Sequence, residues 1–91
     1  MIEVKELERS LKALANRRRL VMLKFLLTHK EATVGELARA IRLSFKSTSK
    51  HLAVLKAANI VEHEQRSISY YYKLNPTLSP AAKTVLALLS S

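Results

Sequence analysis

The spacing of apolar residues along this chain changes twice, and these changes limit the folds that the chain can adopt. Up to about residue 58, apolar side chains recur every three or four positions, which is the period of an α-helix. Over residues 61–74 they alternate with polar ones, as in a strand covered on one face. The helical period returns at about residue 80. Because the 91 residues include one glycine and two prolines, we expect one mainly α domain over residues 1–91, with a single β-hairpin.

Four predicted helices precede the hairpin. The first covers about residues 2–15, and the second follows a predicted cap at Asn16 and is apolar on most sides, as expected for a central helix. Thr33 and Glu36 have the spacing of a capping box, which begins a short third helix. After a break of three or four residues, Ser44 caps the fourth. Two short helices joined by such a turn form a helix-turn-helix.

The fourth helix, residues 45–58, is predicted to have two different faces. Its core face consists of Phe45, Thr48, Leu52 and Leu55. The opposite face carries lysines and small hydroxyl side chains, and no acidic residue occurs between Ser44 and Glu62. Asn59 suits the left-handed position that ends a helix.

The hairpin is predicted as strands at about 61–65 and 68–74, joined around Gln65–Arg66–Ser67. Alternation places Ile68, Tyr70 and Tyr72 together toward the core, whereas Tyr71 faces outward. A final helix at about 80–90 follows a Ser79 cap, with Pro80 at its first position.

The two terminal helices, at about 2–15 and 80–90, each carry an apolar stripe. Together the stripes hold more apolar surface than a domain of this size needs to cover. We therefore expect these helices to form a two-fold homodimer. The residues assigned to its interface are Val4, Leu7, Leu11, Val85, Leu86 and Leu89.

The net charge is +9 and the isoelectric point is about 10.3. Such a charge makes nucleic acid the leading candidate partner, and an anionic membrane surface the second. No apolar run approaches the roughly 20 residues of a membrane span, and the start of the chain is too charged for a secretory signal. We expect a cytoplasmic protein that binds double-stranded DNA and does not enter a membrane.

Nine side chains are assigned to DNA. They are Ser44, Lys46, Ser47, Ser49, Lys50 and His51 around the fourth helix, Arg17 and Arg18 at the start of the second, and Arg66 at the hairpin tip. Each has an ordinary alternative: a solvated basic face for the lysines and Arg17–Arg18, an exposed turn for Arg66, and a half-buried hydrogen bond for His51. Arg19 is predicted to be structural.

The sequence offers no arrangement typical of an enzyme. There is no cysteine and no glycine-rich phosphate loop, and all seven acidic residues are glutamates. His29, His51 and His63 lie on three different predicted elements without a partner at helical spacing. We therefore predict no catalytic residue, no metal site and no cofactor.

Two stretches resemble the ArsR-type winged-helix repressors. "LKALANRRRLVML" is similar to the family's "LKALADPTRLRIL", and "LSFKSTSKHLAVLKAANIV" to its "LSQSTVSHHLKVLREAGLV". "YYKL" at 71–74 resembles the end of the family's wing. The resemblance implies a winged helix in which residues 45–58 read the major groove and hairpin 61–74 is the wing. It also implies dimerisation through the first and last helices.

This chain departs from the family at its metal-binding positions. Thr33 and Gly35 occupy the two Cys positions of the "CVC" motif, and the last helix has neither His nor an acidic residue. In the wing, Ser67 stands where the family usually has a turn glycine, and Ile68 stands where the family often has an arginine. We expect a metal-independent dimeric repressor of a near-palindromic operator, with any small-molecule effector unidentified. The alternative is a winged-helix module that docks an acidic protein.

Overall fold

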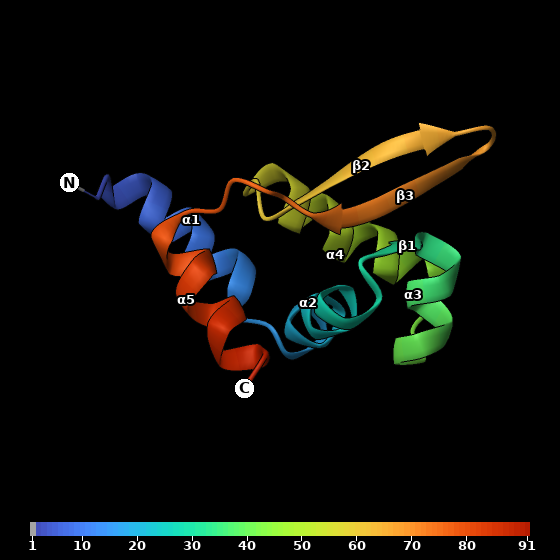
Figure 1. Ribbon diagram of the computed structural model, residues 1–91, viewed down its shortest axis with the longest axis horizontal. Helices are drawn as coiled ribbons and strands as arrows, with labels where there is room; N and C mark the ends of the chain where they lie inside the picture. Colours follow the sequence, from blue (N-terminus) through green and yellow to red (C-terminus); the bar gives the residue numbers. More distant parts are fainter. Residues whose placement is uncertain (1) are drawn as a thin grey trace.

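The computed structural model describes residues 2–91 and contains five helices and one three-stranded antiparallel sheet (Figure 1). The helices are α1 (Val4–Leu14), α2 (Arg17–His29), α3 (Val34–Ile41), α4 (Phe45–Ala57) and α5 (Pro80–Leu89). The strands are β1 (Glu31–Thr33), β2 (Val61–Arg66) and β3 (Ser69–Leu74). The predicted order of helices and hairpin is confirmed, and β1 is an additional strand. No helix within residues 2–91 is long and apolar enough to cross a bilayer.

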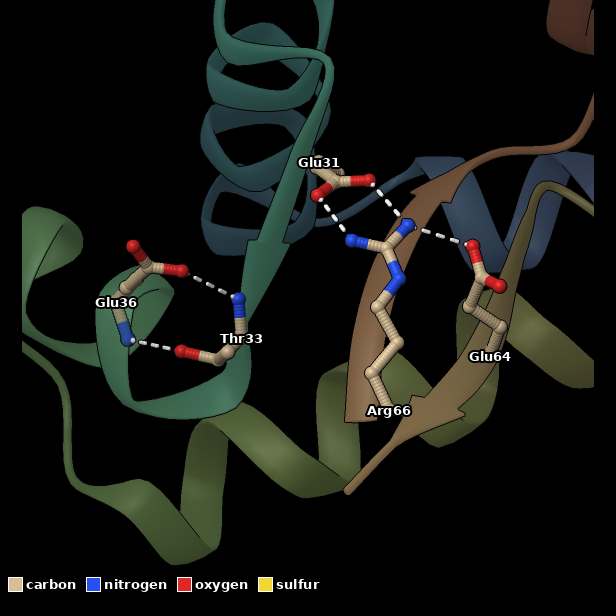
Figure 2. A network of polar contacts seen from close by, with 5 residues as sticks. All are labelled: Glu31, Thr33, Glu36, Glu64 and Arg66. Atoms are coloured by element: carbon tan, nitrogen blue, oxygen red, sulfur yellow. Dashed lines mark hydrogen bonds and ion pairs between the residues drawn. The ribbon is translucent and has the colours of Figure 1, made fainter. Parts of the chain in front are cut away.

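Polar side chains fix the starts of the helices, as predicted. Asn16, Ser44 and Ser79 each accept a backbone N–H bond in the first turn of α2, α4 and α5. At α3, the Thr33 N–H donates to Glu36 Oε1 over 2.8 Å, and the Glu36 N–H donates to Thr33 Oγ1 over 3.1 Å (Figure 2). These bonds satisfy donors that a helix start leaves without a partner. The caps at Thr33 and Ser44 therefore fix the residues at which α3 and α4, the two helices of the helix-turn-helix, begin.

The core lies around α2, the helix predicted to be central. Its largest fully buried side chains come mainly from α2, α3, α4 and the start of β2, and they include Met22, Leu23, Leu26, Leu37, Leu52, Leu55 and Val61. Thr48 is also fully buried on the inner side of α4. Because α4 contacts both α2 and α3 along this side, its rotation about its own axis is fixed.

The short strand β1 connects the helices to the wing. It pairs with β3 in the register Ala32↔Tyr72, so that β3 is the central strand in the order β1-β3-β2. Ala32 is buried in the core cluster. Three residues are too few to show a strand period, which is why the sequence did not predict β1.

Phe45 does not face the core, so this part of the predicted stripe on α4 is wrong. It is 62% exposed, whereas Thr48, Leu52 and Leu55 are fully buried. Phe45 is the first residue of α4, and helical side chains lean toward the N-terminus of their helix. The ring therefore extends past the part of α4 that packs against the domain.

The tip of the hairpin also differs from the prediction. Strand β2 continues to Arg66, and the turn consists of Ser67 and Ile68, with Ser67 at a φ of 58°. Ile68 is 93% exposed and Tyr70 is exposed too, because the hairpin reaches beyond the helices (Figure 1). Of the three residues expected to face the core, only Tyr72 packs against it.

Helices α1 and α5 lie side by side at the end of the molecule away from the hairpin tip (Figure 1). A hydrogen bond of 3.2 Å joins the hydroxyls of Ser10 and Ser79. Leu86 of α5 is only 5% exposed because it belongs to the core of its own protomer. This burial corrects the assignment of Leu86 to the dimer interface, because little of its side chain is accessible to a partner.

The different environments of Phe45 and Leu52 predict different effects on stability. Leu52→Ala leaves a cavity in the core and should lower the free energy of unfolding by about 2–5 kcal/mol. Phe45→Ala removes an exposed ring and should change the free energy of unfolding by no more than about 1 kcal/mol. Urea unfolding followed by circular dichroism measures both. An equal loss in the two variants would contradict the exposed position of Phe45.

Candidate nucleic-acid interface

Lys46 and Lys50 are exposed on α4, on the side opposite Leu52 and Leu55. They lie one turn apart, and the half-exposed Ser49 lies beside them, one residue before Lys50. None of the ion pairs within residues 2–91 includes either lysine. The outer face of α4 is thus positively charged without a carboxylate to balance it.

The N-terminus of α4 adds to this positive face. The Ser44 side chain accepts the Ser47 N–H over 3.1 Å, which leaves the hydroxyl hydrogen of Ser44 available to donate. No acidic residue lies in the first turn of α4. The positive end of a helix dipole favours an anion at this position.

A second group of cations lies beside the turn of the helix-turn-helix. Arg17 and Arg18 are exposed at the first two positions of α2, and they line a shallow hollow together with Arg42, Val21 and Ile41. In the part of the chain that the structure describes, none of these three arginines makes an ion pair. Arg42 was not predicted; its place in the turn, two residues before Ser44, is the signal that identifies it.

Arg19 has the structural role predicted for it. Its Nε donates to the carbonyl of Ala13 over 2.6 Å, and one Nη donates to the carbonyl of Lys12 over 3.2 Å. Both carbonyls belong to the last turn of α1, where helical carbonyls lack partners. The other Nη lies 3.2 Å from Nδ1 of His51 on α4. Arg19 therefore joins α1, α2 and α4.

His51 is half-buried beside this arginine. Because a guanidinium only donates hydrogen bonds, Nδ1 of His51 accepts, and the ring proton is on Nε2. Burial, and then the charges of Arg19 and Arg18, lower the pKa of His51 below its usual value. Both effects favour the neutral ring, and Nε2 makes no hydrogen bond to another residue between 2 and 91.

Arg66, in contrast, is fully engaged within the sheet. It donates to both carboxylate oxygens of Glu31 over 2.7 and 2.8 Å and to Glu64 over 2.6 Å (Figure 2). Its guanidinium also lies 4.6 Å from the centre of the Tyr71 ring. Hydrogen bonds from Arg66 lower the pKa values of Glu31 and Glu64, and the same bonds raise the pKa of Arg66.

The wing is therefore close to neutral, whereas α4 is not. Lys73 of β3 has a partner too, because its Nζ lies 3.5 Å from Glu62. A phosphate at Arg66 would compete with two carboxylates that already hold the guanidinium. The DNA contact assigned to Arg66 stays a prediction. Glu31 is 35 residues away in sequence, so its pairing with Arg66 had no local signal.

The histidines lie far apart in three different surroundings. His29 stacks on Phe25, with ring centres 3.9 Å apart, whereas His63 stacks on Tyr70 at 4.7 Å. Over residues 2–91, no three side chains of the His, Asp and Glu types are grouped closely enough to hold a metal ion.

A separate apolar surface lies on α1. Val4 is 75% exposed and Leu11 is 49% exposed, and together with Leu7 and Ala15 they line a shallow groove. The remaining groove residues, Glu8 and Lys12, form an ion pair of 3.8 Å with each other. On the neighbouring helix α5, Leu88 is 69% exposed. This apolar surface is one that a monomer would leave in water.

The fold and the basic α4 helix define the class of this protein as a winged helix-turn-helix protein. Residues 16–63 match the family described as "Bacterial regulatory protein, arsR family". The chain belongs to the ArsR family, as the sequence motifs indicated.

Named relatives and solved structures agree with this membership. The chain is 40% identical to the transcriptional activator HlyU of Vibrio cholerae over 67 residues, which are 74% of this chain and 61% of HlyU. It is 40% identical to the HTH-type transcriptional regulator Rv2034 of Mycobacterium tuberculosis over 60 residues, 66% of this chain and 56% of that protein. The chain thus spans about three fifths of the curated relatives it matches.

Two structures extend the similarity to most of the chain. The structure of HlyU from Vibrio cholerae has a TM-score of 0.80 at 35% identity, covering 94% of this chain and 89% of HlyU. A homodimeric winged helix-turn-helix DNA-binding domain from Mycobacterium bovis has a TM-score of 0.80 at 29% identity, covering 96% of this chain and 74% of that one.

Proposed function

We propose that this protein is a transcriptional regulator that binds double-stranded DNA as a homodimer, with α4 in the major groove. The observation that carries the proposal is the outer face of α4, where Lys46 and Lys50 have no carboxylate partner. An α-helix fits the major groove, and the second helix of a helix-turn-helix is the one that enters it. DNA phosphates supply the missing negative charge.

Hydrogen-bond donors around α4 lie where the two DNA backbones that flank a major groove would pass. Ser44 and Ser47 lie at the positive end of α4, where they would contact a phosphate. Arg17 and Arg18 would contact a phosphate of the flanking backbone, together with Arg42 in the same hollow. His51 keeps a free Nε2–H that a phosphate or base accepts. Ser49, beside the two lysines, would face the bases.

We propose that the homodimer forms through α1 and α5. The stripe of Val4, Leu7 and Leu11, in which Val4 and Leu11 are exposed, would pack on the same stripe of a second copy. The exposed Leu88 and the half-buried Val85 and Leu89 of α5 would lie at its side. Two-fold symmetry would place the two α4 helices in successive major grooves, about 34–36 Å apart. The operator would then be near-palindromic. The similar domain from Mycobacterium bovis is described as homodimeric, which supports a dimer here.

We propose repression as the regulatory effect, independent of metal. A dimer on promoter DNA excludes other proteins from it without any further contact. HlyU is named an activator, and a bound dimer has either effect according to where its site lies. The threonine and glycine at positions 33 and 35 offer no thiolate ligand, which supports a metal-independent protein. A DNA-binding regulator of this family would act in the cytoplasm. Any effector would be a small molecule, a partner protein or a physical condition such as salt.

The rival function is a module that docks an acidic protein on the same basic face. Both functions use Lys46 and Lys50, but only duplex DNA releases a condensed layer of counterions on binding. Binding sequences should first be selected from a random duplex pool. Titrating the protein with a selected duplex at several salt concentrations should give a steep fall of log affinity with log salt. No duplex binding at low salt would contradict the DNA function.

Changing the two lysines of α4 tests the groove-facing assignment. Lys46→Ala and Lys50→Ala should each weaken binding to a selected duplex on the order of tenfold, because each removes a charge-assisted contact. Each should also reduce the salt slope by about 1. Fluorescence anisotropy measures both quantities.

A matched substitution controls for net charge. Lys83→Ala removes one exposed lysine from α5, away from α4, and should leave affinity nearly unchanged. Circular dichroism and sedimentation should be the same for all three variants. Equal losses of affinity from Lys83→Ala and Lys46→Ala would mean that general charge, not the face of α4, determines binding.

The dimer has its own test. Leu11→Glu places a carboxylate in the middle of the α1 stripe and should convert the dimer to a monomer, because a charge would be buried without a partner. Sedimentation equilibrium measures the mass. Ile68→Glu makes the same kind of change at the wing tip and should leave a dimer. A dimeric Leu11→Glu variant would place the interface elsewhere.

A further inference from the structure

Phe45 is exposed at a place where an apolar ring has no structural task. It is the first residue of α4 and is 62% exposed, and it does not belong to the core cluster. It is also not part of the apolar groove on α1. A single exposed apolar side chain is common on protein surfaces, so the position of the ring on α4, rather than its exposure alone, must indicate a partner.

The surroundings of Phe45 indicate which partner covers it. Lys46 follows it directly, and Ser49 lies one turn further along α4 beside the ring. No acidic residue lies in the first turn of the helix. An acid-free basic helix end complements a polyanion, and Phe45 lies at that end, directly between Ser44 and Lys46, which are proposed to contact DNA. Its position also matches the part of a recognition helix that contacts base edges.

The chemistry of the major groove restricts what an apolar ring can contact there. Guanine, cytosine and adenine present hydrogen-bonding groups, and covering these with a phenyl ring would leave them without partners. Thymine alone presents a C5-methyl group. Stacking on a base would require an unpaired strand, which the groove of a duplex does not offer.

We propose that Phe45 is a specificity-determining residue that packs on the methyl group of a thymine in each operator half-site. Lys46 and Lys50 hold the helix on the backbone, and Ser49 contacts the neighbouring base pair. This inference rests on the proposed DNA function and adds the identity of one base to it. It also gives the exposed ring a partner of defined chemistry.

The test removes the methyl group and nothing else. In a selected duplex, each thymine is replaced in turn by uracil, symmetrically in both half-sites, and affinity is measured by anisotropy. One thymine position should be sensitive, with a loss of about fourfold per half-site, as expected for one buried methyl group. Phe45→Ala should bind the thymine and uracil duplexes equally. Phe45→Leu should still prefer thymine.

The controls separate this inference from the function on which it rests. Lys46→Ala should bind every duplex more weakly and still discriminate thymine from uracil at the same position. If the protein binds no duplex, the proposed function fails first. If it binds and no thymine is sensitive, or if Phe45→Ala discriminates as well as the original protein, the inference about Phe45 is wrong. A change in the mass of Phe45→Ala would instead assign the ring to a protein contact.

Discussion

The packing of α4 against α2 and α3 is the contact on which the rest of the site depends. Helix α4 has no acidic residue to offset its lysines, so its charge does not favour the helix. Leu52 and Leu55 are fully buried in the core shared with α2 and α3. Fully burying side chains of this size contributes about 1.5–3 kcal/mol each. That contact fixes the rotation of α4, and the rotation directs Lys46 and Lys50 outward.

The distribution of charge divides the domain into two parts with different roles. Arg66 of β2 reaches across the sheet to Glu31 of β1 and also holds Glu64 of its own strand, so the wing's arginine joins the two outer strands. These bonds are exposed, and their main effect is on the geometry of the wing rather than on overall stability. By contrast, the lysines of α4 and the arginines of the nearby hollow make no ion pair within residues 2–91. In this member of the family, the helix carries the charge that the proposed DNA contact requires.

Sequence reasoning predicted the features that depend on nearby residues. The caps at Asn16 and Ser44 and the capping box at Thr33 are local patterns, and so is the apolar period that identified α4. The errors have physical causes. Phe45 follows the period of the core stripe, but it lies where the helix has left the core. Strand β1 and the Arg66–Glu31 pair join segments far apart in sequence, and no local pattern specifies them.

The central claim is that the outer face of α4 lies in the major groove of a duplex. Because the chain contains no cysteine, Ser47→Cys provides one site for attaching an iron chelate that cleaves DNA. On a selected duplex, this label should cut at two positions about one helical turn, or roughly 10 base pairs, apart. The same label on Ser90→Cys, beyond α5, should cut weakly or not at all. Diffuse cutting from position 47, or stronger cutting from position 90, would contradict the account.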